Sequence, residues 1–218
     1  MIKVKAAIFD MDGTILDSMP VWLECGEWYL KKLGIRPEPG LGKKLLSLTM
    51  EDGLKYLKEH YELKLSDKEI YDGVKEIIFE SYEKMVTFKP DAENFLIRLK
   101  ESGTKIALCT NTDRILFDPA FNRLGAHNFF DVIHTTSEMG MTKENPEIFF
   151  SIAEELNFSP EETWVFEDAL YSIKTADKAG FNTAGIYDKS FADKKEIIKK
   201  YTTAYFENYK EAEQYFFN

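Results

Sequence analysis

The sequence is poor in cysteine, lacks long apolar segments and has no excess of positive charge. Its two cysteines, Cys25 and Cys109, fall in a helical and an apolar strand pattern, so we expect reduced, buried thiols. No run of about 18 apolar residues and no N-terminal secretion signal is present, which predicts a cytoplasmic protein with no membrane partner. A net charge of −10 argues against sequence-independent nucleic-acid binding.

What the sequence does contain is enough apolar material for a substantial core. Of its 218 residues, 44% are hydrophobic, which suits one large domain or a domain with an insertion. No internal repeat or low-complexity tract interrupts the chain. These features predict an ordinary soluble globular protein.

The stretch 4–17 carries the first chemical signal. An apolar run of strand length, Ala6–Phe9, ends at Asp10, Asp12 and Gly13. Such a buried strand would place two carboxylates beyond its carboxyl end, where open α/β sheets bind ligands. Two like charges about 4 Å apart repel by roughly 4 kcal/mol at an effective dielectric near 20, so a bound cation or a shifted pKa is expected.

Two ordinary interpretations of Asp-x-Asp-Gly do not fit. A hairpin is disfavoured because the residues after Gly13 lead into a helix-start signature, Asp17, Ser18 and Pro20, and not into a returning strand. A calcium loop counted from Asp10 would require Gly where Ile15 stands. The stretch resembles the first motif of the haloacid dehalogenase superfamily, whose members are mostly phosphate-transferring enzymes.

The residues from 17 to 86 show helical patterns only. One helix is predicted from about Ser18 to Leu33, because its apolar stripe stops at Gly34. Thr49 with Asp52 begins a later helix, and Ser66 with Glu69 forms a capping box for a long one. We therefore expect a helical cap domain at residues 17–86, which could close over the site and exclude water.

After Pro90, helices and strands alternate, which argues for a parallel sheet with right-handed crossovers. The predicted fold is an α/β, Rossmann-like, doubly wound core at residues 1–16 and 87–218, with the helical cap inserted after the first strand. The later strands are expected at Lys105–Cys109, Asp131–Thr135, Thr163–Phe166 and Thr183–Tyr187, followed by a final strand and helix near the C-terminus.

A second polar site follows the second core strand, at Thr110 and Asn111, just before a helix beginning near Asp113. A hydroxyl and a helix N-terminus there could hold a phosphate oxygen. Ordinary helix capping explains the same residues equally simply. The resembled family has a Thr or Ser at this strand end, and Thr110 fits it.

A third site is Lys143, shortly before a helix with an apolar face. A cation directed at the acids would neutralise both an aspartate and transferring phosphoryl oxygens, whereas an isolated Lys is usually exposed. The family commonly has Lys-Pro here. This chain keeps Lys143 and Pro146 but has Glu144 in place of the first Pro.

A fourth site repeats the opening design, because an apolar strand ends in Glu167 and Asp168 before a helix. Helix capping is the simpler alternative. Two acid clusters at the ends of parallel strands favour a hard cation such as Mg²⁺, which takes carboxylate and carbonyl oxygens. The family often has Glu-Asp-Ser here with a Gly three residues later, where this chain has Ala169 and Ser172.

The resemblance covers nearly the whole chain and implies a magnesium-dependent phosphatase acting on a small phosphomonoester. Asp10 would be the nucleophile that forms an aspartyl phosphate, and Asp12 the general acid and base. Mg²⁺ would be held by Asp10, the Asp12 carbonyl and Asp168, with Glu167 direct or through water. Thr110, Asn111 and Lys143 would bind the phosphoryl group or substrate. A monomer is expected, with a dimer as the alternative.

Two other functions stay open at this stage. A sugar phosphomutase resembling β-phosphoglucomutase is the first, although its first motif commonly has Val where this chain has Thr14. Trp22 and Met50 also stand about where that enzyme's cap has His and Arg. A non-catalytic protein that binds phosphorylated metabolites is the second. The presence of Asp12 counts against the dehalogenases, which lack that acid and the metal.

Overall fold

The computed structural model describes residues 3–218, which form two compact units. The sheet unit comprises residues 3–17, Thr87–Arg114 and Phe121–Asn218, and the helical unit comprises Ser18–Val86 and Ile115–Ala120. The helical unit is therefore mainly one insertion after the first strand. In the described residues, no helix combines the length and apolar character needed to cross a membrane.

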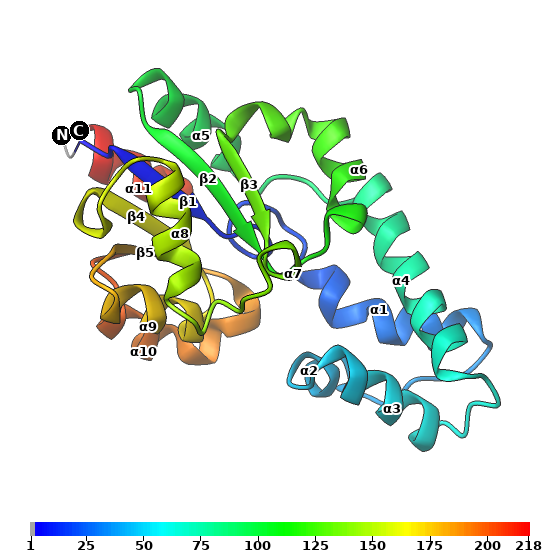
Figure 1. Ribbon diagram of the computed structural model, residues 1–218. Coiled ribbons are helices and arrows are strands. Elements are labelled where there is room, and N and C mark those ends of the chain that lie inside the picture. Colours follow the sequence, from blue (N-terminus) through cyan, green and yellow to red (C-terminus); the bar gives the residue numbers. More distant parts are fainter. Residues whose placement is uncertain (1–2) are drawn as a thin grey trace. The chain divides into compact units, whose positions relative to one another are not determined.

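The sheet unit is built on six parallel strands in the order β3-β2-β1-β4-β5-β6 (Figure 1). Their bounds are β1 Ala6–Phe9, β2 Lys105–Thr110, β3 Val132–Thr135, β4 Thr163–Glu167, β5 Asn182–Ile186 and β6 Ala204–Phe206. The first strand in sequence lies at the centre, and the order runs outward from it in both directions. Open parallel sheets with this reversal bind ligands at the carboxyl ends of the strands beside it.

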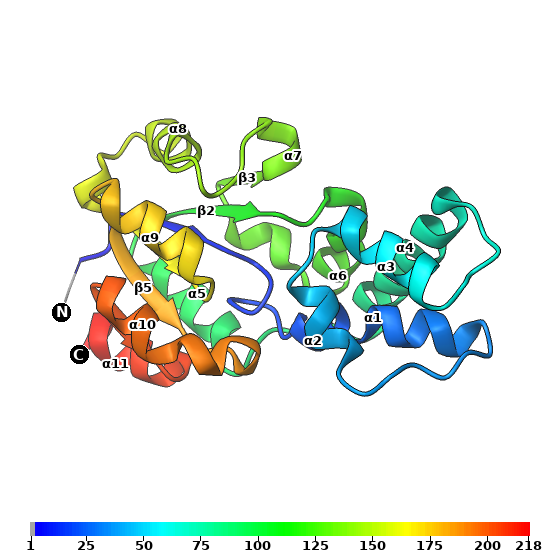
Figure 2. The same ribbon diagram turned by 90° about the horizontal axis from the view of Figure 1, so that it is seen from below.

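Helices cover both faces of the sheet (Figure 2). Ile8 and Val165 face α8 (Glu147–Glu155), whose Ile148 and Ile152 join the same buried cluster. On the opposite face, Phe9 stacks on Phe166, with ring centroids 4.2 Å apart, and both contact Phe95 of α5 (Ala92–Glu101). The strand alternation thus buries both faces, which explains the nearly continuous apolar character of β1.

Outside residues 18–86, the remaining helices are short connections or outer layers. They are α6 Arg114–Leu124, α7 Thr136–Met139, α9 Leu170–Lys178, α10 Lys195–Ile198 and α11 Tyr209–Phe217, with 3-10 turns at Ala126–Phe129, Pro160–Glu162, Lys189–Lys194 and Lys199–Tyr201. The Lys-rich segment 189–200 does not form one regular helix, because Phe191 adopts a non-helical backbone conformation.

The helical unit contains α1 Met19–Lys32, α2 Leu41–Leu46, α3 Met50–His60 and α4 Asp67–Lys84. The Ser66 and Glu69 side chains form the predicted capping box of α4. Helix α2 lies very close to α1 at Gly42. A Cβ added at Gly42 would be only 2.0 Å from the Leu23 carbonyl oxygen. Only Gly permits this backbone approach.

The predicted fold class is confirmed: the core is a Rossmann-like parallel sheet with helices on both faces. The predicted final strand and helix are present as β6 and α11. All four expected strands differ from the observed ones by one residue at an end: β2 and β4 each extend one residue further, β3 begins one residue later, and β5 is displaced by one residue toward the N-terminus. Cys25 and Cys109 are free and buried, as predicted.

Candidate active site

The site is assembled at the carboxyl ends of β1, β2 and β4. Phe9 of β1 pairs with Leu108 of β2 and with Phe166 of β4. The next residues are therefore held in register, and the Asp10 backbone N–H donates to the Phe166 carbonyl, with an N···O distance of 2.9 Å. This pairing brings together polar residues more than 90 positions apart in the sequence.

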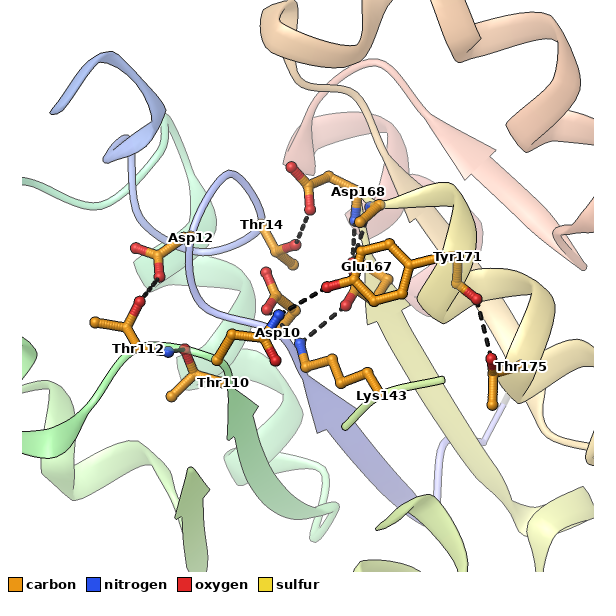
Figure 3. Close-up of polar contacts among 12 residues, drawn as sticks. Asp10, Asp12, Thr14, Thr110, Thr112, Lys143, Glu167, Asp168, Tyr171 and Thr175 are labelled. Atoms are coloured by element: carbon orange, nitrogen blue, oxygen red, sulfur yellow. Dashed lines mark hydrogen bonds and ion pairs between the residues drawn. The ribbon is translucent and has the colours of Figure 1, made fainter. Parts of the chain in front are cut away.

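Lys143 lies at the centre of this group (Figure 3). Its ammonium group donates to Asp10 Oδ1 and to Glu167 Oε1, the latter at 2.9 Å, and only 1% of its side chain is exposed. Burial lowers the pKa of Lys143, but the two carboxylates outweigh it and raise the pKa well above its usual value. Lys143 is consequently a fixed positive charge.

Three donor atoms of the surrounding chain hold Glu167. Its Oε2 accepts hydrogen bonds from the backbone N–H groups of Asp168 and Ala169, each at 2.9 Å, while its Oε1 accepts from Lys143. Backbone donors just before α9 thus fix one oxygen, and an ammonium hydrogen fixes the other. The bonds to Glu167 reach the two residues before Leu170, and α9 has no side-chain cap, so the capping alternative from the sequence is not what fixes this residue.

Asp10, Glu167 and Asp168 offer a possible metal site. Each contributes a carboxylate oxygen, and these oxygens lie within 4.8 Å of one another. In the described chain, no hydrogen bond reaches Oδ2 of Asp10 or Oδ2 of Asp168, although both atoms are buried. Hard cations bind such oxygens, and a cation would compensate the charge that burial otherwise disfavours. The acid cluster therefore fits a divalent ion.

The protonation of the metal-free acids supports this interpretation. Burial raises the pKa of Asp10 from 3.8 to about 7, with Glu167 and Asp12 adding to the rise and Lys143 opposing it. Burial and the charges of Asp10 and Glu167 likewise raise the pKa of Asp168 well above its usual value. Lys143, together with Lys89 near Asp168, does not compensate all of these carboxylates.

Asp168 is approached by groups that the sequence analysis did not identify. The Thr14 hydroxyl donates to Asp168 Oδ1 at 3.4 Å. Nearby, the largely buried Lys89 ammonium donates to the Gly13 carbonyl at 2.6 Å and to Asp188 at 3.0 Å. Lys89 thereby connects the first acidic loop to the end of β5. No local pattern around Lys89 indicates this long-range contact.

Asp12 is held differently from the other acids. It is not a member of the candidate metal-binding cluster of Asp10, Glu167 and Asp168, and its Oδ2 accepts a hydrogen bond from the Thr112 hydroxyl at 2.6 Å (Figure 3). Thr110 is fully buried, and its hydroxyl oxygen accepts from the Thr112 backbone N–H at 3.1 Å. Thr112 was missed by sequence reasoning, although its position two residues after Thr110 places it in the same loop.

Asn111 lies on the outer side of the same loop. Its amide donates to the Tyr171 hydroxyl at 2.7 Å, which connects the loop after β2 to α9. Tyr171 is 41% exposed, yet burial and the nearby Glu167 carboxylate raise its pKa. Of the predicted site residues, Asp10, Lys143, Glu167 and Asp168 are joined directly, whereas Asp12, Thr110 and Asn111 belong to the neighbouring loop network.

Comparison with known proteins agrees with this geometry. A family model described as haloacid dehalogenase-like hydrolase matches residues 7–186. The chain therefore belongs to the haloacid dehalogenase-like hydrolase family, as its motifs predicted.

Named relatives cover nearly the whole chain. The chain is 27% identical over 196 residues to the phosphorylated carbohydrates phosphatase of Thermotoga maritima, with 90% of this chain and 91% of the relative covered. It is 28% identical to the phosphoglycolate phosphatase of Psychrobacter arcticus, with 82% and 81% covered. These phosphatases support phosphoric monoester hydrolysis as the reaction class.

A solved structure from Thermotoga maritima, provisionally named a beta-phosphoglucomutase, has a TM-score of 0.83 and 27% identity. It matches 93% of this chain, and the match covers 94% of the Thermotoga chain. The predicted enzyme class, a haloacid dehalogenase-like hydrolase, is confirmed.

Proposed function

We propose that this protein is a magnesium-dependent phosphatase that hydrolyses a small phosphomonoester through an aspartyl-phosphate intermediate. The observation that carries the proposal is the buried Asp10 carboxylate. One of its oxygens accepts a hydrogen bond from Lys143. Its other oxygen has no hydrogen-bond partner in the described residues, and Asp10 lies next to the carboxylates of Glu167 and Asp168. A nucleophile and compensating positive charge are thus present together.

In the first step, an Asp10 oxygen attacks phosphorus, and the bond between phosphorus and the ester oxygen breaks. Asp12 gives its proton to that leaving oxygen, so the product alcohol departs neutral. Lys143, with Thr110 as a hydroxyl donor, stabilises negative charge on the transferring group. In the second step, Asp12 takes a proton from water, whose oxygen bonds to phosphorus and releases Asp10.

Asp10, Asp168 and the Asp12 carbonyl are the proposed magnesium ligands, with Glu167 direct or through water. When bound there, the ion supplies charge neutralisation for the nucleophile and the phosphoryl oxygens. Among residues 3–218, Oδ2 of Asp10 and Oδ2 of Asp168 have no hydrogen-bond partner, which supports this assignment. Asn111 is proposed as a weaker substrate contact, because its amide already donates to Tyr171.

We propose small phosphorylated metabolites as the substrate class. The two named phosphatases of Thermotoga and Psychrobacter act, by their names, on phosphorylated carbohydrates and phosphoglycolate. Both names describe small phosphorylated compounds. A cytoplasmic monomer with no nucleic-acid or membrane partner remains our expectation from the sequence.

We propose that residues 17–86 act as a cap that selects the substrate, and that residues 1–16 and 87–218 form the catalytic core. In the helical unit, the Trp22 indole donates to the buried Tyr82 hydroxyl at 2.9 Å. Its N–H is thus already used, so Trp22 presents no cation or free donor for a second phosphate. A mutase must hold such a phosphate, and this difference favours hydrolysis.

The experiment is to incubate purified protein with Mg²⁺ and a panel of phosphomonoesters that includes p-nitrophenyl phosphate, phosphoglycolate and hexose phosphates. We expect release of inorganic phosphate from at least one small ester, and none from the Asp10→Asn variant. If no member of the panel, p-nitrophenyl phosphate included, yields inorganic phosphate, the proposed function is wrong.

A phosphomutase is the second candidate because the similar Thermotoga structure carries that provisional name. Phosphorus NMR separates the two functions directly. With glucose 1-phosphate, a phosphatase releases inorganic phosphate, whereas a mutase builds up glucose 6-phosphate faster than phosphate. The second outcome would replace the phosphatase assignment while leaving Asp10 as nucleophile.

A further inference from the structure

Thr112 connects two of the proposed functional residues. Its hydroxyl donates to Asp12 Oδ2 at 2.6 Å, and its backbone N–H donates to Thr110 Oγ1 at 3.1 Å. Only 4% of Thr112 is exposed, so water competes little for either contact. Figure 3 shows Thr112 between Asp12 and Thr110 in the loop that follows β2.

The hydroxyl contact determines which way the Asp12 carboxyl group is presented. A Thr hydroxyl has one hydrogen, and here that hydrogen is directed at Oδ2, so Oδ2 acts as an acceptor. A proton that Asp12 transfers must then be carried by its other oxygen. The contact therefore fixes both the rotation of the carboxyl group and the atom that exchanges protons.

The backbone contact acts similarly on Thr110. Because Thr110 Oγ1 accepts the Thr112 N–H, its own hydroxyl hydrogen is left to donate in another direction. Thr110 is fully buried at the end of β2, next to the β1 end that carries Asp10. Thr112 thus sets the orientation of Asp12, the proposed proton donor, and of Thr110, whose hydroxyl is proposed to hydrogen-bond the phosphoryl group.

We propose that Thr112 is a positioning residue that holds Asp12 in the orientation needed for proton transfer to the leaving oxygen. The inference rests on the proposed phosphatase function and adds a specific role to a residue outside its four motifs. It also predicts a dependence on the leaving group. Esters with poor leaving groups need the Asp12 proton, whereas p-nitrophenolate leaves readily without it.

The test compares three variants by kcat/KM with the sugar phosphate that wild type hydrolyses fastest and with p-nitrophenyl phosphate. Thr112→Val removes the hydroxyl at nearly constant shape, and Thr112→Ser retains it. Thr104→Val is the matched control, because Thr104 is also 4% exposed and donates its hydroxyl to the Val4 carbonyl at 2.8 Å. Thr104 stands before β2, at the end opposite Thr110.

We expect Thr112→Val to lower kcat/KM for the sugar phosphate by about 10- to 100-fold, and for p-nitrophenyl phosphate by less than about threefold. Thr112→Ser and Thr104→Val should stay within about threefold of wild type on both substrates. Equal losses on both substrates, or no loss on either, would overturn the positioning role.

A crystal structure of the wild-type protein gives a test independent of activity. The inference requires the Thr112 hydroxyl within hydrogen-bond distance of Asp12, and Thr112→Val should release that carboxyl group to a different rotamer. A wild-type structure without the contact overturns the inference even if phosphatase activity is found. Conversely, wild type with the contact but without any phosphatase activity refutes the proposed function, and the catalytic role of Thr112 falls with it.

Discussion

The two acidic strand ends, after β1 and after β4, have the same residue types but hold them differently. At β4, Glu167 and Asp168 are adjacent, and both join the buried acid cluster that could hold a metal ion. At β1, the fully buried Met11 separates Asp10, which joins the cluster, from Asp12, which pairs with Thr112. One apolar residue between the two acids of β1 therefore separates the proposed proton-transferring acid from the acids of the candidate cation site.

The difference follows from what each backbone does after its strand. After β4, the backbone N–H groups of Asp168 and Ala169, the two residues before α9, donate to Glu167 Oε2. After β1 the chain forms a tight loop in which Ile15 and Leu16 both donate to the Met11 carbonyl. The helix start keeps neighbouring acids together, whereas the loop directs alternate side chains to different partners.

The largest expected effect comes from replacing Asp10, which lies at the end of β1 and is also a member of the acid cluster. Asp10→Asn retains the shape but removes the nucleophile, so kcat should fall on the order of 10³-fold or more. Asp177→Asn on exposed α9 is the matched control and should stay near wild type. Turnover by Asp10→Asn within about tenfold of wild type would require another nucleophile.

Lys143 joins the two strand ends, because its ammonium group donates to both Asp10 and Glu167. Lys143→Met leaves Asp10 and Glu167 without their ammonium donor, so kcat/KM should fall on the order of 10²-fold. The variant should also have a lower thermal midpoint than wild type. Added Mg²⁺ should restore part of that midpoint, because it supplies the missing positive charge. A Lys143→Met enzyme as active as wild type would show that this cation is only structural.

The β4 end should act mainly through the metal. Asp168→Asn removes a proposed ligand whose Oδ2 is otherwise unpaired, so the Mg²⁺ concentration for half-maximal activity should rise by about 10- to 100-fold. Isothermal titration with Mg²⁺ provides the measurement apart from turnover. Undiminished wild-type activity in excess chelator would contradict the metal assignment altogether.

The raised pKa of Asp10 predicts an unusual pH dependence for the metal-free protein. Between about pH 4 and 7, the folded state retains a proton that the unfolded state has released, because the folded pKa is about 7 against 3.8. This stabilising contribution is complete below about pH 4 and is lost as the pH rises through 7. Thermal midpoints with chelator should show it.

The Asp10→Asn variant provides the control for that titration, because an amide does not ionise in this range. Its thermal midpoint should fall less than that of wild type between pH 5 and about pH 7. Saturating Mg²⁺ should reduce the same difference in wild type, since a bound cation stabilises the ionised carboxylate. Identical pH profiles for wild type and variant would show that Asp10 titrates normally.

Much of the fold was predictable because its signals are local. The apolar run before Asp10, the capping box at Ser66 and the alternation after Pro90 each follow from neighbouring residues, and each is present in the structure. The acid positions in the candidate site followed from strand ends in the same way. Their assigned roles remain predictions.

What the sequence did not reveal depends on contacts across the sheet. Thr112 meets Asp12 across 100 positions, and Lys89 meets Asp188 across 99. Neither pairing has a local pattern, because each depends on which strands become neighbours in the order β2-β1-β4-β5. A list of motif residues therefore finds the groups that could react, but not the residues that orient them.

The smallest expected effect concerns the outer contact between the β2 loop and α9. Tyr171→Phe removes only the hydroxyl that accepts from the Asn111 amide, so the free energy of unfolding should change by about 1 kcal/mol or less. We expect KM to change by less than about tenfold with kcat retained, because neither side chain contacts the acid cluster by a hydrogen bond in the described residues. Asn111→Ala should give the same result, since both variants break one contact, and the double variant should add little. A large loss of kcat in Tyr171→Phe, measured with saturating Mg²⁺, would instead place the phenol in the reaction itself and move the boundary of the active site outward to α9.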